Sequence, residues 1–465
     1  MNEFFLLMKS ELMVTAIIFL LLFIKVGKGM QNERLLPLIQ LLLLLNVIFG
    51  FFFNQEGNAF GDMFHSTPMI VFEKNILNVG VYLISMLFSD WFKKTAHLAE
   101  YFLLMLSALL GMFFMLSSAN MLMFYLALEL ASIPVAAMAN FNLTQKQSSE
   151  AAMKMILSAA FSSGILLFGI SLIYGVTGTI NFEELSNYTT LSPLYTMAFI
   201  FLFSAFAFKL SVVPFHFWTA DVYEGAPIAT TSFLSVISKA AVAFILITVL
   251  YKVFQPLQNI WYVLVLLLAF ITIVIGNLFA MRQQNMKRFL AYSSIAQVGF
   301  ILVGISGSNT TGISSVVYFL LVYVFSNLAA FGVVSVISEQ VNKESISDYK
   351  GLYQTNPLLT WVLALSLFSL AGVPPTAGFF GKFFLLTAGG AKASYAFMIV
   401  VVLNMVISLY YYLKVVRAMF IDQNETPIAA IQISAPVKLA LIICSAGILL
   451  IGLFGWIFDF IQSLN

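Results

Sequence analysis

The sequence predicts an all-α polytopic membrane protein with about fourteen transmembrane helices, arranged around two inverted five-helix repeats. Three observations predict this fold. Hydrophobic residues make up 61% of the 465 positions, charged residues make up only 9%, and long apolar stretches recur without a soluble domain between them. A water-facing shell needs far more polar residues than this chain has, so lipid must surround most of it.

The same composition excludes several classes of protein. An average soluble domain has about 25% charged residues, so a soluble enzyme, a disordered chain and a nucleic-acid-binding protein are all excluded. The net charge of +2 gives no bias toward acidic partners. With one cysteine, Cys444, and three histidines, His65, His97 and His216, we expect no iron–sulfur, haem or zinc site. We therefore expect no cofactor on this chain and assign any redox chemistry to partner chains.

The first apolar run indicates a retained membrane helix rather than a cleavable signal peptide. Glu11 precedes the run 12–24, and Lys25 and Lys28 follow it. A signal peptide carries its positive charge in front of the apolar run. We therefore expect a first spanning helix whose N-terminus lies outside the cytoplasm.

Apolar stretches long enough to span a bilayer recur along the whole chain. We number them helices 1 to 14, in the order 10–26, 35–53, 70–91, 98–117, 119–138, 150–176, 193–226, 229–251, 258–281, 290–306, 311–338, 357–389, 394–420 and 434–458.

The placement of basic residues agrees with this count. Fourteen of them fall in connections that the topology places in the cytoplasm: Lys25, Lys28, Arg34, Lys93, Lys94, Lys146, Arg282, Lys287, Arg288, Lys343, Lys350, Lys414, Arg417 and Lys438. The opposite side holds four: Lys9, Lys74, Lys252 and Lys392. This excess is the positive-inside bias of membrane proteins, and a wrong helix count would scramble it.

Helices 7 and 12 are longer than a bilayer requires, and each contains an internal proline. Pro214 interrupts helix 7 and Pro374-Pro375 interrupts helix 12, with Lys209 and Lys382 near the two breaks. Broken helices survive in lipid only inside protein or along hydrated cavities. Two such helices five apart predict repeats, which in transporters are often inverted. The predicted units are helices 1–3 (1–97), a first repeat of helices 4–8 (98–251), a second repeat of helices 9–13 (258–420) and helix 14 (434–465).

Four ionisable residues fall deep in predicted helices, namely Glu129, Lys209, Lys239 and Lys382. A lysine at the bilayer centre costs about 2.5–3.5 kcal/mol, so these residues must be paired or hydrated. A buried lysine with a movable carboxylate partner can change its protonation state, which is what a proton carrier requires. The alternative is that they form structural ion pairs or extend to the membrane interface.

Other polar residues allow two interpretations of their role. Lys154 follows Glu150 by one helical turn, so it is either a further proton ligand or half of an ordinary helix-stabilising pair. His216 is either a proton relay or a core histidine near the break at Pro214. Asp221 and Glu224 are expected to cap or order the end of helix 7. Small residues at 111, 164 and 169, all glycine, predict close helix packing.

Several long motifs resemble one family. These are VVPFHFWTADVYEGAPIATTSFLSVISKA at 212–240, NMKRFLAYSSIAQVGFILVG at 285–304, SLAGVPPTAGFFGKFFLL at 369–386, EAAMKMILSAAFSSGILLFG at 150–169 and LALELASIP at 126–134. In this order they resemble the subunit N family of respiratory complex I, the proton-translocating NADH:quinone oxidoreductase, whose members are antiporter-like membrane subunits. A lysine in helix 12 agrees with subunit N, because subunit M typically has glutamate there.

The resemblance implies a proton-translocating role without a cofactor on this chain. It implies that Glu129 and Lys209 form a Glu–Lys pair, that Lys239 is the central lysine, that Lys382 is the exit-side lysine, and that Lys154 lies near the pair. Gln297 departs from the family, which commonly has histidine at that position.

The resemblance also implies partners. These are the membrane-arm subunits M, J and K, with quinone, NADH, flavin and iron–sulfur clusters reached only through the complex. Two alternatives stay open, a subunit of a multi-subunit cation/proton antiporter and a non-conducting structural subunit.

Overall fold

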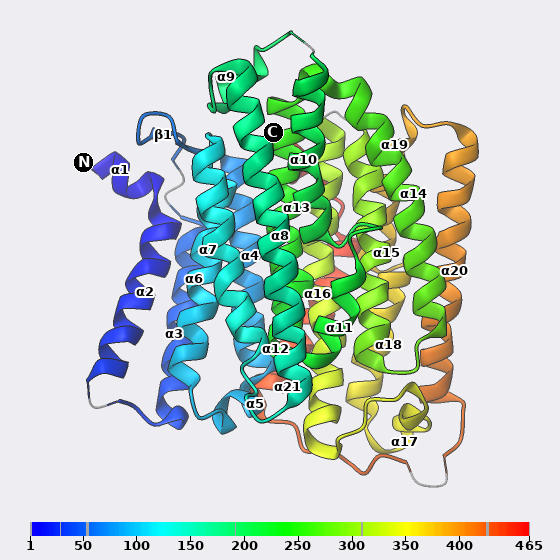
Figure 1. The fold of residues 1–465 in the computed structure, drawn as a ribbon. Helices are drawn as coiled ribbons and strands as arrows, with labels where there is room; N and C mark the ends of the chain where they lie inside the picture. The colour runs from blue at the N-terminus through cyan, green and yellow to red at the C-terminus, as the bar shows by residue number, and fades with distance from the viewer. Residues whose placement is uncertain are drawn as a thin grey trace.

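The computed structural model describes residues 2–27, 29–52, 55–190, 192–307, 310–424 and 427–464, so Lys28 lies outside the described residues. The described chain is a bundle of roughly parallel and antiparallel helices (Figure 1). One small antiparallel hairpin, in which Asn58 pairs with His65, lies at one end of the bundle.

The elements up to the first helix break are α1 (Asn2–Leu7), α2 (Lys9–Val26), α3 (Asn32–Gly50), β1 (Gly57–Ala59), β2 (Phe64–Ser66), α4 (Pro68–Leu87), α5 (Ser89–Lys94), α6 (Leu98–Leu116), α7 (Met121–Ala139), α8 (Lys146–Thr177), α9 (Phe182–Ser186), α10 (Pro193–Leu210) and α11 (Phe217–Gly225). The next span combines α12 (Ile228–Ser232), the π-helix η1 (Phe233–Ser238), α13 (Lys239–Thr248) and a second π-helix, η2 (Val249–Val253). The remaining elements are η3 (Gln255–Leu257), α14 (Gln258–Arg282), α15 (Met286–Ser306), α16 (Thr310–Val341), η4 (Ile346–Tyr349), α17 (Leu352–Thr355), α18 (Pro357–Ala371), α19 (Ala377–Gly390), α20 (Tyr395–Phe420), α21 (Ala435–Leu453) and α22 (Trp456–Ser463).

Within the described residues, twelve helices are long and apolar enough to cross a membrane. The other two predicted spans also correspond to helices. α2 carries Lys9, Glu11 and Lys25, and the predicted helix 12 is divided into the shorter α18 and α19. A multi-pass membrane fold is therefore confirmed, whereas the number fourteen stays a prediction.

Both predicted helix breaks are present, and their backbones match. The residue that follows each helix, Ser211 after α10 and Gly372 after α18, has a positive φ. In both, the next amide bonds back to the carbonyl five residues earlier, Val212 to Ala207 and Val373 to Phe368. A cis peptide bond follows in each break, at Pro214 and at Pro375.

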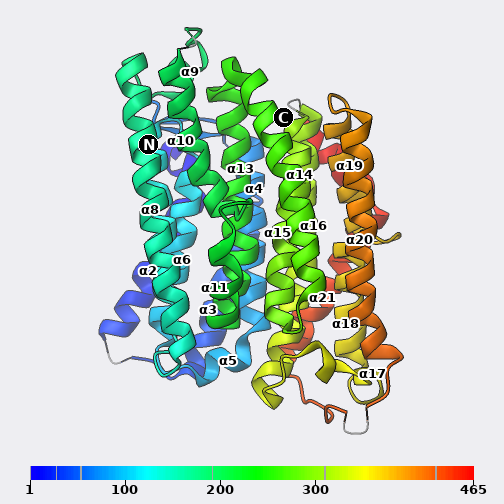
Figure 2. The same cartoon turned by 45° about the vertical axis from the view of Figure 1, so that its right-hand side comes forward.

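The two broken helices run in opposite directions through the bundle. Figure 2 shows α11 below α10, whereas α19 lies above α18. An inverted repeat requires this opposite orientation, although the boundaries of the two repeats stay predictions.

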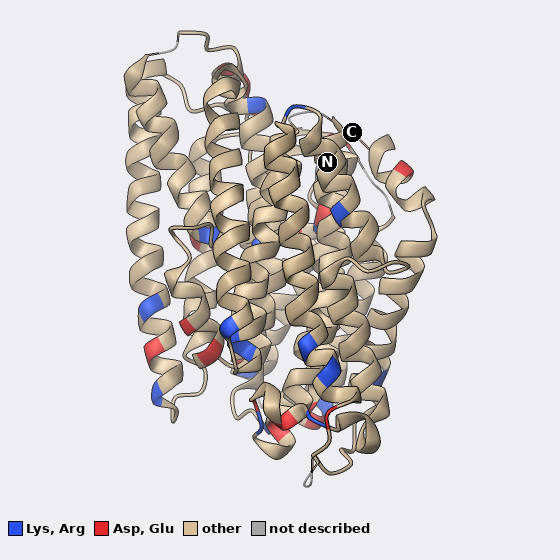
Figure 3. Cartoon of the chain, turned by 90° about the vertical axis from the view of Figure 1, so that its right-hand side faces the viewer, with Lys and Arg blue, Asp and Glu red and all other residues tan. Residues whose placement is uncertain are grey.

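Charged residues collect at one end of the bundle, the end that carries α5 and α17 (Figures 1 and 3). We call this end the basic side. Here Lys287 at the start of α15 forms an ion pair of 2.5 Å with Glu344, just beyond α16. Burial alone would raise the pKa of the Glu344 carboxyl, but Lys287 and hydrogen bonds from Ser338 and Asn285 lower it. This cluster ties the ends of α15 and α16 together.

Glycines allow some helices to approach closely. A Cβ on Gly111 would lie 2.4 Å from the Ala131 nitrogen, and one on Gly169 would lie 3.0 Å from the Leu202 nitrogen, as the sequence predicts. The prediction for Gly164 is wrong. No atom lies within 4 Å of a Cβ added there, because Gly164 is on the exposed face of α8.

Gly276 gives a test of this packing. Its added Cβ would lie 2.7 Å from the backbone nitrogen of Ala296, in the close contact between α14 and α15. We expect Gly276→Val to cost about 1–3 kcal/mol, as overpacking does, and to reduce the amount of chain in the assembled membrane complex on native gels. Gly164→Val is the matched control and should assemble normally. Equal assembly of the two variants would contradict this account.

Candidate functional site

Lys239 lies at the centre of the bundle, where η1 meets α13. Its side chain is 2% exposed, and its amine donates a hydrogen bond of 2.8 Å to the Ser294 hydroxyl on α15. The Tyr223 ring lies 5.4 Å from the amine. A π-helical turn directly before a residue is frequently a mark of a functional position, because it changes the direction in which the side chain projects.

Lys209 and Glu129 lie near each other but do not form an ion pair in this structure. The Lys209 amine donates instead to the Ser132 hydroxyl at 2.5 Å, one turn beyond Glu129 on α7. One Glu129 carboxylate oxygen is buried and has no hydrogen-bond partner in the described part of the chain. The predicted Glu129–Lys209 pair is therefore not in contact in this structure, and Ser132 on α7 occupies the contact position.

A small cavity separates Lys209 from the central helix. Its lining includes Ser132, Lys209, Trp218 and Ser238, and it holds about 20 Å³ of space for water centres. About 10–15 Å³ of such space is enough for one water molecule. Ser238 directly precedes Lys239, so this cavity has room for one water molecule between the two lysine-bearing helices.

On the other side of Lys239, polar groups lead toward the second helix break. Ser293, next to Ser294, forms a hydrogen bond with the Tyr412 hydroxyl. Gln297 donates both to this hydroxyl, at 3.1 Å, and to the Leu370 carbonyl, at 2.9 Å. The amide of Gln297 thus connects the surroundings of Lys239 to the end of α18.

Lys382 lies at the same end of α18. It is fully buried, and its amine donates to the Ala371 carbonyl at 3.3 Å and lies 4.6 Å from the Phe300 ring centre. The break after α18 leaves the last backbone carbonyls of this helix without intrahelical donors. Gln297 and Lys382 therefore bind consecutive carbonyls, those of Leu370 and Ala371.

Lys154 belongs to a different cluster. Its amine lies 2.7 Å from both Glu150 and Asp221, and the side chain is 41% exposed. Arg288 completes the cluster with bonds of 2.9 Å to Asp221 and 2.7 Å to Glu224. Glu150 and Lys154 thus form the helix-stabilising pair that the sequence allows. The carboxylates of Asp221 and Glu224 order the end of α11 by joining it to α8 and α15.

His216 lies within the first break, 6% exposed, with its ring 4.5 Å from that of Phe217. No bond from its ring to Lys209 or Lys239 is present among the described residues, so its relay role stays a prediction. Within the same residues, no group of three or more His, Cys, Asp or Glu side chains could hold a metal ion.

Sequence reasoning missed the neutral and cationic partners in these clusters. Ser132, Ser294 and Tyr412 hold or neighbour the buried lysines, and Arg288 joins the carboxylates of α11. Only Ser132 carried a local signal, since it lies three residues after Glu129 on one helix face.

Two oppositely directed broken helices, each with a buried lysine, define an antiporter-like membrane subunit. The family described as NADH:quinone oxidoreductase/Mrp antiporter, transmembrane, matches residues 118–408. The chain belongs to this family, on the branch formed by NADH-quinone oxidoreductase subunit N.

A relative supports this branch, and solved structures share the fold. The chain is 44% identical to NADH-quinone oxidoreductase subunit N of Phocaeicola vulgatus over 98% of both chains. It is also similar to a chain of respiratory complex I from Thermus thermophilus, with 28% identity, a TM-score of 0.82, and coverage of 96% of this chain and 97% of that one. A chain of the Mrp complex from Dietzia sp. shares the fold, with a TM-score of 0.88 at 18% identity over 98% and 96% of the two chains.

Gln297 offers a test of the polar connection. We expect Gln297→Leu to lower NADH-driven proton pumping on the order of tenfold, because both of its hydrogen bonds are lost and about 1.4 kcal/mol corresponds to tenfold in rate. Gln297→His keeps a hydrogen-bonding ring and should retain pumping. Proton pumping and quinone reduction are measured together in membrane vesicles. If Gln297→Leu pumps like the parent, the link does not run through this residue.

Proposed function

We propose that this chain translocates protons through the row Glu129, Lys209, Lys239 and Lys382 as a membrane-arm subunit of NADH:quinone oxidoreductase, coupled to quinone reduction elsewhere in the complex. The observation that carries the proposal is the environment of Lys239. Its buried amine is bonded to a serine hydroxyl. In the described part of the chain no carboxylate lies within 4.0 Å of it.

This environment supports reversible protonation. A buried charge without a counter-ion is costly, so the neutral amine is accessible and can release its proton. A serine hydroxyl can accept from the ammonium or donate to the neutral amine, so Ser294 suits both states. A permanent carboxylate partner at contact distance would hold the proton in place.

Glu129 supplies the adjustable element. It lies one turn before Ser132 on α7, and Ser132 separates its carboxylate from contact with the Lys209 amine. A movement of α7 against α10 would change this separation and with it the stability of the Lys209 charge. Moving one charge against the membrane potential costs about 2.3 kcal/mol per 100 mV, and relocating a lysine charge from the bilayer centre involves about 2.5–3.5 kcal/mol. The cost of moving one charge across 100 mV and the cost of a lysine charge at the bilayer centre are therefore of similar size.

The wider setting is also part of the proposal. We place the chain in a bacterial inner membrane with a periplasmic N-terminus, on the basis of the excess of Lys and Arg in the connections on the basic side. Its partners are the neighbouring membrane-arm subunits, of which M, J and K are the expected ones. Flavin, iron–sulfur clusters and the quinone site belong to other chains, and no redox centre or cofactor is assigned to this one.

A second candidate is a subunit of a multi-subunit cation/proton antiporter, which the fold shared with the Mrp complex chain favours. Purification of the complex from its native membrane distinguishes the two. Flavin and iron–sulfur subunits that co-purify with the chain support the first proposal, and their absence from an otherwise intact assembly supports the second.

Substitution of the central lysine tests the function. Lys239→Ala removes the lysine at the middle of the row, so we expect proton pumping to fall on the order of a hundredfold in the assembled complex. Lys146→Ala, at an exposed position on the same side of the chain as other basic residues, is the matched control. Pumping and NADH oxidation that are unaltered by Lys239→Ala, alone and combined with Lys209→Ala, would establish a non-conducting structural subunit instead.

A further inference from the structure

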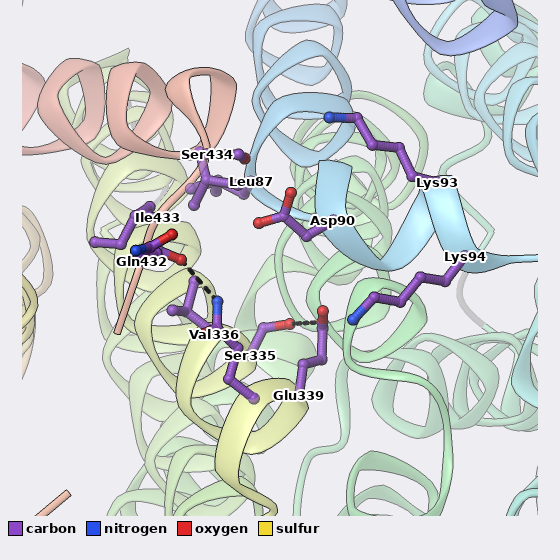
Figure 4. Close-up of a pocket in the computed structure, with 12 residues that line it drawn as sticks. Leu87, Asp90, Lys93, Lys94, Ser335, Val336, Glu339, Gln432, Ile433 and Ser434 are labelled. Atoms are coloured by element: carbon purple, nitrogen blue, oxygen red, sulfur yellow. Dashed lines mark hydrogen bonds between the residues drawn. The ribbon is translucent and has the colours of Figure 1, made fainter. Parts of the chain in front are cut away.

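A second polar cavity opens at the basic side, away from the row of lysines. It has a volume of about 420 Å³ and lies between α4, α5, α16 and the segment that leads into α21 (Figure 4). Its polar lining includes Asp90, Lys93, Lys94, Ser335, Glu339 and Gln432. A polar cavity of this size holds many water molecules.

Glu339 is the ionisable residue of this cavity that belongs to a core helix. It projects from the last turns of α16, is partly buried, and accepts a hydrogen bond from Ser335 one turn earlier. Figure 4 shows the Lys94 side chain pointing toward the Glu339 carboxylate. No cation lies within 4.0 Å of this carboxylate in the described residues. Glu339 therefore faces water without being held in an ion pair.

A polar stripe continues from Glu339 along α16 at intervals of four residues, the spacing that brings side chains on successive turns into contact. After Ser335 it passes Phe331 and reaches Asn327, which donates to the Tyr323 hydroxyl at 2.6 Å and to Ser235 at 2.9 Å. Ser235 precedes Lys239 by four residues on the central span. The stripe thus runs from the cavity to the surroundings of the central lysine.

One apolar position interrupts this stripe. Phe331 is fully buried and separates Ser335 from Asn327, which are about 12 Å apart along the helix axis. Hydrophobic constrictions in conducting proteins control passage by excluding or admitting water. A single aromatic side chain between two polar segments has the form of such a constriction.

We propose that this cavity is a proton-uptake vestibule in which Glu339 collects protons for Lys239, and that Phe331 closes the path between them when it is dry. The proposal deepens the proposed function and rests on it. In the uptake step a hydronium ion gives its proton to the Glu339 carboxylate and leaves as water. When water bridges Phe331, the acid passes that proton on and the neutral Lys239 amine becomes ammonium.

The charges of the cavity favour water and protons in it over a bound anion. The carboxylates of Asp90 and Glu339 face the same space as Lys93 and Lys94, so a phosphate or lipid headgroup would meet like charges. Water and protons meet no such penalty.

Substitution of Glu339 tests the vestibule. We expect Glu339→Gln to slow NADH-driven proton uptake from the basic side roughly tenfold, as the loss of a proton-transfer group does, and Glu339→Asp to restore most of it. Glu33→Gln, which removes an exposed carboxylate on α3 outside the cavity, is the matched control and should pump normally. Glu339→Gln that pumps like Glu33→Gln, in a complex where Lys239→Ala abolishes pumping, overturns the vestibule and leaves the proposed function intact.

A labelling experiment covers the case in which Glu339→Gln fails to assemble. Cys444 is the only cysteine, so Cys444→Ala gives a thiol-free chain. In that background we expect Asp90→Cys, at a partly exposed position in the cavity lining, to react with a charged thiosulfonate added from the basic side, and pumping to fall as it reacts. Ala330→Cys, fully buried on α16, is the control. Asp90→Cys that is as unreactive as Ala330→Cys, or that reacts without any loss of pumping, overturns the proposal.

Discussion

The cost of an unpaired charge in hydrocarbon determines how this bundle is organised. Each lysine of the central row offsets that cost with a hydrogen bond to a neutral oxygen of another segment: Ser132 for Lys209, Ser294 for Lys239 and the Ala371 carbonyl for Lys382. Neutral partners satisfy an amine without fixing its charge, since they provide no opposite charge that would stabilise the ammonium permanently. The helices must therefore be held in a register that delivers these oxygens, and the glycine contacts between α14 and α15 show how closely they approach.

A contrast within the same chain supports this reading. Glu11 and Lys74 form an ion pair of 2.5 Å in which both side chains are 1% exposed. There the opposite charges are in contact, and the pair joins α2 to α4 as a structural unit. In the half-exposed cluster of Lys154, Asp221 and Arg288, opposite charges are likewise in contact. The charges in these two clusters are paired with opposite charges, whereas the lysines of the central row are bonded to neutral groups.

The two helix breaks supply what continuous helices lack. An unbroken helix uses its own carbonyls, so it offers no acceptor at the middle of the membrane. The break after α18 frees the carbonyls of Leu370 and Ala371, and these receive Gln297 and Lys382. Gln297 therefore maintains a hydrogen-bonded connection between Tyr412 and the end of α18. An amide can bridge hydrogen bonds in this way but does not itself titrate.

The sequence by itself determined the membrane class, the approximate spans, the positions of both breaks and the burial of Lys239 and Lys382, because hydropathy, proline and charge are local properties of the chain. Only the tertiary structure decided which groups meet. Ser132 rather than Glu129 contacts Lys209, Arg288 joins Asp221 across 67 positions, and Gly164 faces outward instead of packing. These outcomes depend on the rotation and register of helices that are distant in sequence, which the packing of their side chains fixes and which no local pattern contains.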